Sequence, residues 1–348
     1  MATLMSAPTV EHKIRAYLDA RRAGVAYLLR HLNADGSIGP VERGVYYYRV
    51  PWVLAISGET VPATRLIAWI RRHMLTPEGE FAGAPSPDGA ANSSANTYAE
   101  TCLAYGAHLL RQFDVAKSAM RFALRFQDPE TGGIFMDRQR LGPDDPQILY
   151  LTCQFGMSAL VTGQYAAAES AGQWVKRLWE AQPELPDRLY TISTRAGGLA
   201  TAVPTEADRR HYVNESQEVR EMHYNGGIAA AFLTRLYQAT GDASWLDLAR
   251  QYQSFSMNST ERQFEVMQVC KSGWGSALLY LVTGEPLYRD WTVTMGDWFV
   301  ANQHADGHWE NSRYVAPDSP LESNLATTAE FVNHLDCIAG ALAAGSVA

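Results

Sequence analysis

The sequence predicts an all-α protein that folds as an (α/α)6 barrel, a closed double ring of six helical hairpins. Along the 348 residues, a long amphipathic stretch runs six times into a short Gly/Asp-rich break and then into an apolar stretch rich in small residues. Periods of roughly 40 to 60 residues are typical of helix pairs that bury their apolar sides only by stacking on neighbours. Strand signals are limited to residues 189–203, where a small β-hairpin or a long loop is expected.

The first stretch of each pair is expected to form an outer helix with one face in water. In the first of them, Ile14, Tyr17, Leu18 and Val25 recur at helical spacing, with charged residues between them. The outer helices are predicted at about residues 11–32, 62–75, 113–127, 165–181, 243–256 and 286–302.

The second stretch of each pair is nearly uncharged beyond its first turn and is expected to form a buried inner helix. The breaks before these helices are clearest at residues 33–39, 76–81, 127–135 and 303–309, with looser counterparts at 182–187 and 257–262. The inner helices are predicted at residues 45–57, 94–110, 147–162, 221–240, 264–283 and 324–342. Gly58, Gly163, Gly241 and Gly284 follow four of them, as expected where a left-handed residue ends a helix.

The composition favours one barrel domain. The chain is 47% hydrophobic and no linker or charge block divides it, so residues 11–345 are expected to form a single domain with an insert at about 190–220. Residues 1–10 are expected to be disordered, and they lack the apolar run of a signal peptide. No segment has the length of apolar sequence that spans a membrane, so a cytoplasmic protein is expected.

The charge distribution limits the expected partners. The net charge of −8 is spread over interspersed acidic and basic residues, without the basic stripe that binds nucleic acid or an anionic membrane. A small-molecule substrate is the expected partner, and the sequence leaves homo-oligomer formation open.

No CxxC pair occurs among the four cysteines, which fall on different predicted inner helices: Cys102, Cys153, Cys270 and Cys337. Dispersed thiols argue against a disulfide framework, and each is interpreted first as a small apolar residue between helices. The alternative is a nucleophile or ligand that faces the cavity. This alternative role is better supported for two cysteines: Cys270, which is next to Lys271, and Cys337, which shares a helix face with Glu330.

Polar and aromatic side chains gather where the predicted inner helices begin, which is one mouth of the expected barrel. Buried polar groups are costly unless they are used or satisfied, and Glu330 on a nearly uncharged helix is the most anomalous acid. The candidate catalytic residues are Glu330, His334, His223, Tyr98 and Cys270. The candidate substrate-binding residues are Tyr48, Arg49, Trp52, Asn96, Glu100, Tyr150, Tyr224, Asn225, Lys271 and Trp274.

Structural interpretations stand beside these assignments. His223 and His334 also fit core or capping roles, and Asp144 and Asp145, which have prolines on both sides, indicate a turn. No HExxH or CxxC motif occurs, and no metal site is predicted. Glycine-rich nucleotide loops and the GxSxG elbow are also absent from the sequence, so no cofactor is expected.

The alternation of outer helix, Asp-Gly turn ending in an aromatic residue and apolar inner helix, clearest at residues 303–309, resembles the α/α-toroid superfamily. That superfamily holds squalene-hopene-type terpenoid cyclases and protein prenyltransferase β-subunits. The resemblance covers most of the chain but lies in the repeat: the DxDD motif of the cyclases has no match, and the prenyltransferase zinc set cannot be placed. The turns also resemble those of six-hairpin glycosidases and sugar epimerases, to which residues 224–242 are similar, and the barrels of the linalool dehydratase/isomerase type.

Three hypotheses for function follow. The first is a lyase or isomerase that performs acid/base cyclisation, dehydration or rearrangement of a largely apolar isoprenoid or polyketide-like molecule in the cavity. In the second, two carboxylates such as Glu100, Glu221 or Glu330 act on a carbohydrate, as in a glycoside hydrolase or a uronic-acid epimerase or lyase. The third is a non-catalytic helical ring that binds a partner. Lone cysteines and few acids on the inner helices favour the first hypothesis.

Overall fold

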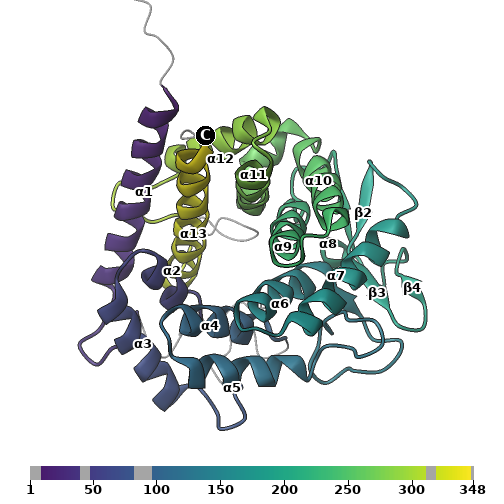
Figure 1. The fold of residues 1–348 in the computed structure, drawn as a ribbon, viewed down its shortest axis with the longest axis horizontal. Coiled ribbons are helices and arrows are strands. Elements are labelled where there is room, and N and C mark those ends of the chain that lie inside the picture. Colours follow the sequence, from purple (N-terminus) through teal and green to yellow (C-terminus); the bar gives the residue numbers. More distant parts are fainter. Residues whose placement is uncertain (1–8, 40–47, 82–95, 311–318, 346–348) are drawn as a thin grey trace, which may run out of the picture.

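The computed structural model describes residues 9–39, 48–81, 96–310 and 319–345. Within these ranges, twelve α-helices of seven residues or more form two concentric rings around a central axis (Figure 1). The prediction of an all-α (α/α)6 barrel is confirmed. Most of the N-terminal stretch predicted to be disordered lies outside the described residues, and the first helix begins at Val10.

The inner ring is formed by the apolar stretches. It comprises α2 (Val50–Ile56), α4 (Tyr98–Leu109), α6 (Leu149–Val161), α9 (Tyr224–Thr240), α11 (Cys270–Thr283) and α13 (Leu321–Gly345). Each inner helix packs against the next in this order, and α13 packs against α2, so the ring is closed. Because these helices are covered on nearly every side, their sequences are apolar around the whole helix rather than along one stripe.

The outer ring is formed by the amphipathic stretches. It comprises α1 (Val10–Arg30), α3 (Thr60–His73), α5 (Phe113–Leu124), α7 (Tyr165–Glu180), α10 (Ala243–Met257) and α12 (Pro286–Ala301). The first helix α1 packs against the last inner helix α13 and against α12, which joins the two ends of the chain (Figure 1).

The short connections lie at the C-terminal ends of the inner helices and use left-handed residues. Gly58, Gly163, Gly241 and Gly284 have φ values of +82°, +80°, +74° and +68°, which confirms their prediction as helix ends. At the corresponding point between α4 and α5, Arg111 takes the same region with φ 59°. This conformation is unfavourable for a residue with a side chain.

The Asp-Gly turns lie at the other end of the barrel and dock on the next outer helix. A Cβ atom on Gly79 would lie 2.1 Å from the carbonyl oxygen of Ser118 in α5. A Cβ atom on Gly307 would lie 2.3 Å from the carbonyl oxygen of Ala23 in α1. Only glycine allows this close approach, and the contact of the last turn with the first helix shows again that the outer ring closes.

The long connection between α7 and α9 carries most of the strand structure. Here β3 (Ile192–Thr194) and β4 (Gly198–Leu199) form the hairpin expected at residues 189–203, and β1 (Gln147–Ile148) extends it to three antiparallel strands. A second pair joins β2 (Arg188–Tyr190) to β5 (Val213–Glu215), which follows the short helix α8 (Arg209–Tyr212). The expectation that residues 264–283 form one helix is wrong in its first part, because extended Val266 separates two 3-10 turns, Glu261–Glu265 and Met267–Val269, before α11.

Within the described ranges, no helix combines the length and the apolar character that crossing a membrane requires.

Candidate active site

Side chains from the mouth ends of the inner helices meet around the barrel axis and form what we call the axial belt. The axial belt consists of Tyr48, Arg49, Tyr98, Tyr150, Tyr224, Lys271 and Glu330. All but one lie within two residues of the start of a helix; α13 begins earlier than the others, so Glu330 lies in its third turn. The sequence places these polar groups where the long connections enter the inner ring.

Each member of the axial belt contacts the next one around the ring. The ring centroids of Tyr48 and Tyr98 lie 6.1 Å apart, those of Tyr98 and Tyr150 5.9 Å, and those of Tyr150 and Tyr224 6.1 Å. The Lys271 Nζ atom lies 4.6 Å from the centre of the Tyr224 ring. These edge-to-face, tilted and cation–π contacts hold the belt side chains in fixed positions.

Two ion pairs to Glu330 close the belt. Its Oε2 atom accepts a hydrogen bond of 2.6 Å from Arg49 Nη1, and its Oε1 atom pairs with Lys271 Nζ. The side chains of Glu330, Arg49 and Lys271 are 2%, 11% and 7% exposed. A buried carboxylate needs such partners, and with two cations around one anion the group carries a net positive charge.

Tyr98 is tied to the same group. Arg49 Nη2 donates a hydrogen bond of 2.8 Å to the phenol oxygen of Tyr98. Burial raises the pKa of Tyr98, so the phenol stays protonated at neutral pH. Its own hydrogen atom is therefore available for donation.

His334 lies one helical turn after Glu330 and is the second titratable group of the site. Its Nε2 atom is 3.7 Å from Glu330 Oε1, and within the described part of the chain neither ring nitrogen has a hydrogen-bond partner. Burial lowers the pKa of His334 to about 4, with Lys271 and Arg49 adding to the effect and Glu330 opposing it. At neutral pH the imidazole is uncharged and can accept a proton.

Tryptophan rings form the floor of the site. Trp52 and Trp274 cross the axis with their ring centroids 6.1 Å apart, and Trp52 stacks on Tyr105 at 4.0 Å. The space between this floor and the axial belt is about 10 Å³, enough for about one water molecule or one small polar group. Below the floor, a second cavity of about 490 Å³ opens toward the short turns.

The cysteines are mainly packing residues. Burial raises the pKa of the Cys102 and Cys337 thiols to about 12 and raises that of Cys153 well above its usual value, so these three are not thiolates at neutral pH. Cys270, the candidate nucleophile, lies at the site with its Sγ atom 3.8 Å from Glu330 Oε1.

The structure corrects the assignment of Glu100 to substrate binding. Its carboxylate points away from the axis, accepts a hydrogen bond of 2.9 Å from the backbone N–H of Phe81 and pairs with Arg138. In other repeats Thr152 and Thr328 accept the same bond from the residue that ends the Asp-Gly turn. Glu100 therefore holds a turn to an inner helix.

Three further candidates lie apart from the Glu330 group. His223 is the residue before α9, where its Nε2 atom is 3.0 Å from the carbonyl oxygen of Glu218. Asn96 accepts a hydrogen bond of 3.0 Å from the N–H of Tyr98, and the side chain of Asn225 bonds that of Asn214 at 2.7 Å. The Asn96 contact satisfies an N–H at the start of α4, and the other two contacts join the start of α9 to the insert.

The structure adds three residues that the candidate set lacked. Tyr105 supports the floor, and Gln154 and Asn333 line the space above it. Each lies three, four or seven residues after a belt residue on the same helix, the spacing of one helix face. Adding the residues that share a helix face with each belt residue would have placed these three in the candidate set.

Two groups of described side chains could supply metal ligands. One is Cys270, Glu330 and His334; the other is His304, His308 and Glu310 on the surface. In the first group the carboxylate is already held by Lys271 and Arg49, and two cations next to a ligand set oppose a divalent ion. The arrangement favours acid/base chemistry there.

No family model and no curated protein sequence matches the chain. Solved structures do match it over nearly its whole length. A D-mannose isomerase has a TM-score of 0.66 at 11% identity, with 96% of this chain and 99% of that chain covered. The GH76A α-1,6-mannanase from Salegentibacter sp. HEL1_6 has a TM-score of 0.62 at 12% identity, with coverages of 94% and 99%.

A type II terpene cyclase from Scytonema, in complex with geranylgeranyl dihydroxybenzoate, is also similar. Its TM-score is 0.56 at 15% identity, with 94% of this chain and 99% of that chain covered. Identities at this level speak to the fold alone. The chain therefore has the α/α-toroid fold, which the sequence repeat predicted and which isomerases, glycoside hydrolases and terpene cyclases share.

Proposed function

We propose that the chain is an enzyme of the isomerase or lyase type that moves a proton on a small molecule bound at the axial belt. The observation that carries this proposal is the buried Glu330 carboxylate, which lies between Arg49 and Lys271 with the uncharged His334 imidazole 3.7 Å away. A carboxylate and a neutral imidazole side by side are suited to general acid/base catalysis.

Arg49 and Lys271 suit the stabilisation of negative charge on a substrate oxygen. Removing a proton from a carbon next to a carbonyl group places negative charge on the carbonyl oxygen, and buried cations stabilise such an oxyanion strongly. The space beneath the belt holds one group of that size. In this scheme His334 accepts the proton, Glu330 orients the cations and the imidazole, and Tyr98 donates a proton to the oxygen or to the leaving group.

The charges also bear on the kind of substrate. Two cations at the site disfavour a carbocation, which argues against the isoprenoid cyclisation that the first hypothesis allowed. A carbonyl compound that reacts through an enolate, such as a polyketide-like molecule, agrees better with the cations. The four tyrosine rings of the belt provide flat apolar walls for it.

A sugar isomerase is the second candidate. Aldose–ketose isomerisation also moves a proton next to a carbonyl group, and the similarity to a D-mannose isomerase supports it. A two-carboxylate glycosidase is less well supported, because Glu330 is the one carboxylate among the described residues that line the space above the floor.

A ligand panel followed by isotope exchange tests the proposal. Polyketide-like carbonyl compounds and aldoses are screened for an increase in Tm, and compounds that bind are incubated with the enzyme in D₂O. We expect the protein to catalyse deuterium incorporation next to the carbonyl group of a bound compound, as measured by proton NMR. Binding without exchange or turnover across both classes would instead support the non-catalytic hypothesis.

A further inference from the structure

The last Asp-Gly turn carries side chains that the other turns lack. In this turn the N–H of His304 donates to the carbonyl oxygen of His308 at 2.9 Å. The N–H of Gly307 donates to the carbonyl oxygen of His304 at 2.8 Å. The first turn has the same pattern, in which Asn33 bonds Ser37 through both backbone and side chain. The turn thus brings two side chains together, and in the last repeat both are histidines.

The two histidines and a glutamate converge on one point. The rings of His304 and His308 lie 4.4 Å apart and 18° from parallel, and His304 Nε2 lies 3.6 Å from Glu310 Oε1. One ligand atom from each of the three residues lies within 4.8 Å of the other two. Two ligands bound tetrahedrally to zinc at about 2.0–2.1 Å are about 3.3 Å apart, so small side-chain rotations bring all three onto one ion.

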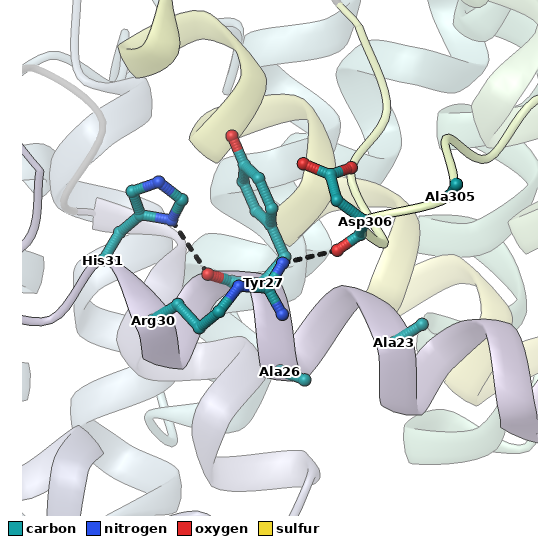
Figure 2. A pocket seen from close by; sticks show the side chains of 7 residues that line it. All are labelled: Ala23, Ala26, Tyr27, Arg30, His31, Ala305 and Asp306. Atoms are coloured by element: carbon teal, nitrogen blue, oxygen red, sulfur yellow. Dashed lines mark hydrogen bonds between the residues drawn. The ribbon is translucent and has the colours of Figure 1, made fainter.

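Neighbouring groups hold the turn and one of its histidines in place. The Nδ1 atom of His308 bonds the carboxylate of Asp306, which leaves its Nε2 atom with the lone pair that a metal binds. Arg30 of α1 donates to the backbone carbonyl of Asp306, and Tyr27 stacks on His308 at 5.1 Å. Figure 2 shows Tyr27, Arg30 and His31 of α1 beside Asp306 on this surface.

The buried residue between the ligands anchors the turn to the barrel. The N–H of Trp309 donates to Thr328 of α13 at 3.2 Å, and its indole donates to the carbonyl oxygen of Phe299 of α12 at 2.8 Å. His304 and Glu310 remain about two-fifths exposed, so water can complete the coordination.

We propose that this turn binds a divalent transition-metal ion through His304, His308 and Glu310, with Asp306 orienting His308. Two imidazoles and one carboxylate favour Zn²⁺, Ni²⁺ or Cu²⁺ over Mg²⁺ and Ca²⁺, which prefer oxygen ligands. The H-x3-H spacing of the histidines is the sequence signal for this site, and the proposal departs from the expectation of no metal. It is independent of the chemistry at the axial belt.

Calorimetric titration of the full chain with Zn²⁺ tests the proposal. We expect one ion per chain in the wild type, the same binding in excess Mg²⁺, and at least about 100-fold weaker binding in the His304→Ala/His308→Ala variant. Asn33→Ala/Ser37→Ala, in the corresponding first turn, is the matched control and should bind like the wild type. His334→Gln, which removes a ligand of the internal group, should also keep the site.

Titration with Co²⁺ gives a second readout, because bound histidines produce visible absorption bands that the double-histidine variant should lack. The proposal is overturned if wild-type protein does not bind Zn²⁺, or if the double-histidine variant binds it with unchanged affinity.

Discussion

Two faces of the inner helices carry buried acids with different partners. Glu330 faces the barrel axis, where it pairs with Arg49 and Lys271 beside an uncharged histidine. Glu100 faces the seam between the two rings, where it holds the Phe81 amide and Arg138. Both acids are almost fully buried, so burial of a charged group does not by itself indicate function.

The chemistry around each acid explains the difference. Glu100 replaces threonines that make the same bond in other repeats, so it belongs to the structural repeat. Glu330 has no such counterpart among those bonds, and its neighbours include a histidine without hydrogen-bond partners in the described chain. An uncharged imidazole next to a buried carboxylate is the feature that distinguishes the candidate active site, because Glu100 and Arg138 also have atoms without a hydrogen-bond partner in the described chain.

The largest effect is expected from Glu330→Gln. Loss of the carboxylate should reduce turnover by up to about 10⁴-fold, because the His334 imidazole that accepts the proton and the two cations lose the group that orients them. Two buried cations then lack their anion, so the free energy of unfolding should also fall by about 3–5 kcal/mol. Adding Lys271→Met should restore part of this stability without restoring turnover. Recovery of turnover in the double variant would contradict the assignment.

Glu100→Gln should give the opposite pattern. Among the described residues, the variant leaves Arg138 with Glu80 as its remaining acidic partner, which is expected to lower the free energy of unfolding by about 3 kcal/mol. Urea denaturation measures this loss, while kcat/KM at a temperature where the variant is folded should stay near the wild-type value. A selective loss of kcat/KM in a stable variant would place Glu100 in the active site after all.

The pH dependence of stability should reveal His334. Its pKa in the folded protein is about 4, below the unfolded value of 6.5, so the unfolded chain binds more protons between these two values. The contribution is fully present above pH 6.5 and is lost as the pH falls toward 4, by at most about 3 kcal/mol.

The variant His334→Phe should therefore flatten part of the decrease in stability between pH 6.5 and 4. Denaturation at several pH values measures this change in slope. His211→Gln is the positive control and should flatten the profile in the same pH range, because burial also lowers the pKa of His211 to about 4. An unchanged pH profile in His334→Phe would show that this imidazole is not held neutral by the fold.

The smallest expected effect concerns the short-turn end of the barrel, far from the axial belt. Arg111→Gly relieves a left-handed backbone and should raise the free energy of unfolding by about 0.5–1 kcal/mol. Gly163→Ala, which adds a Cβ atom into open space at a left-handed position, should lower it by about 1 kcal/mol. Equal stabilities of Arg111→Gly and the wild type would mean that other contacts absorb the strain at residue 111.

The architecture could be predicted because each repeat contains residue patterns that determine the local secondary structure. Amphipathic spacing gave the outer helices, and glycines such as Gly241 marked the helix ends. The proximity of Glu330 and His334 could also be predicted, since residues four apart lie on one helix face. The start of α11 was missed because extended Val266 interrupts an otherwise apolar stretch.

The direction of a side chain on a fully buried helix could not be predicted. An inner helix is apolar on every side, so its sequence does not reveal which face turns to the axis and which to the outer ring. Glu100 was therefore grouped with Tyr98, although its partner Arg138 lies 38 residues further along the chain. The sequence predicts Trp52 and Trp274 as substrate-binding residues, and only the three-dimensional arrangement shows that their rings form a floor.

Proton exchange in the two glutamate variants tests the central claim most directly. For a carbonyl compound that raises the Tm of the wild type, deuterium incorporation next to the carbonyl group is followed in D₂O by NMR. We predict that Glu100→Gln exchanges this proton at nearly the wild-type rate and that Glu330→Gln loses the exchange while still binding the compound. Exchange at the wild-type rate in Glu330→Gln would contradict the assignment of proton transfer to the axial belt.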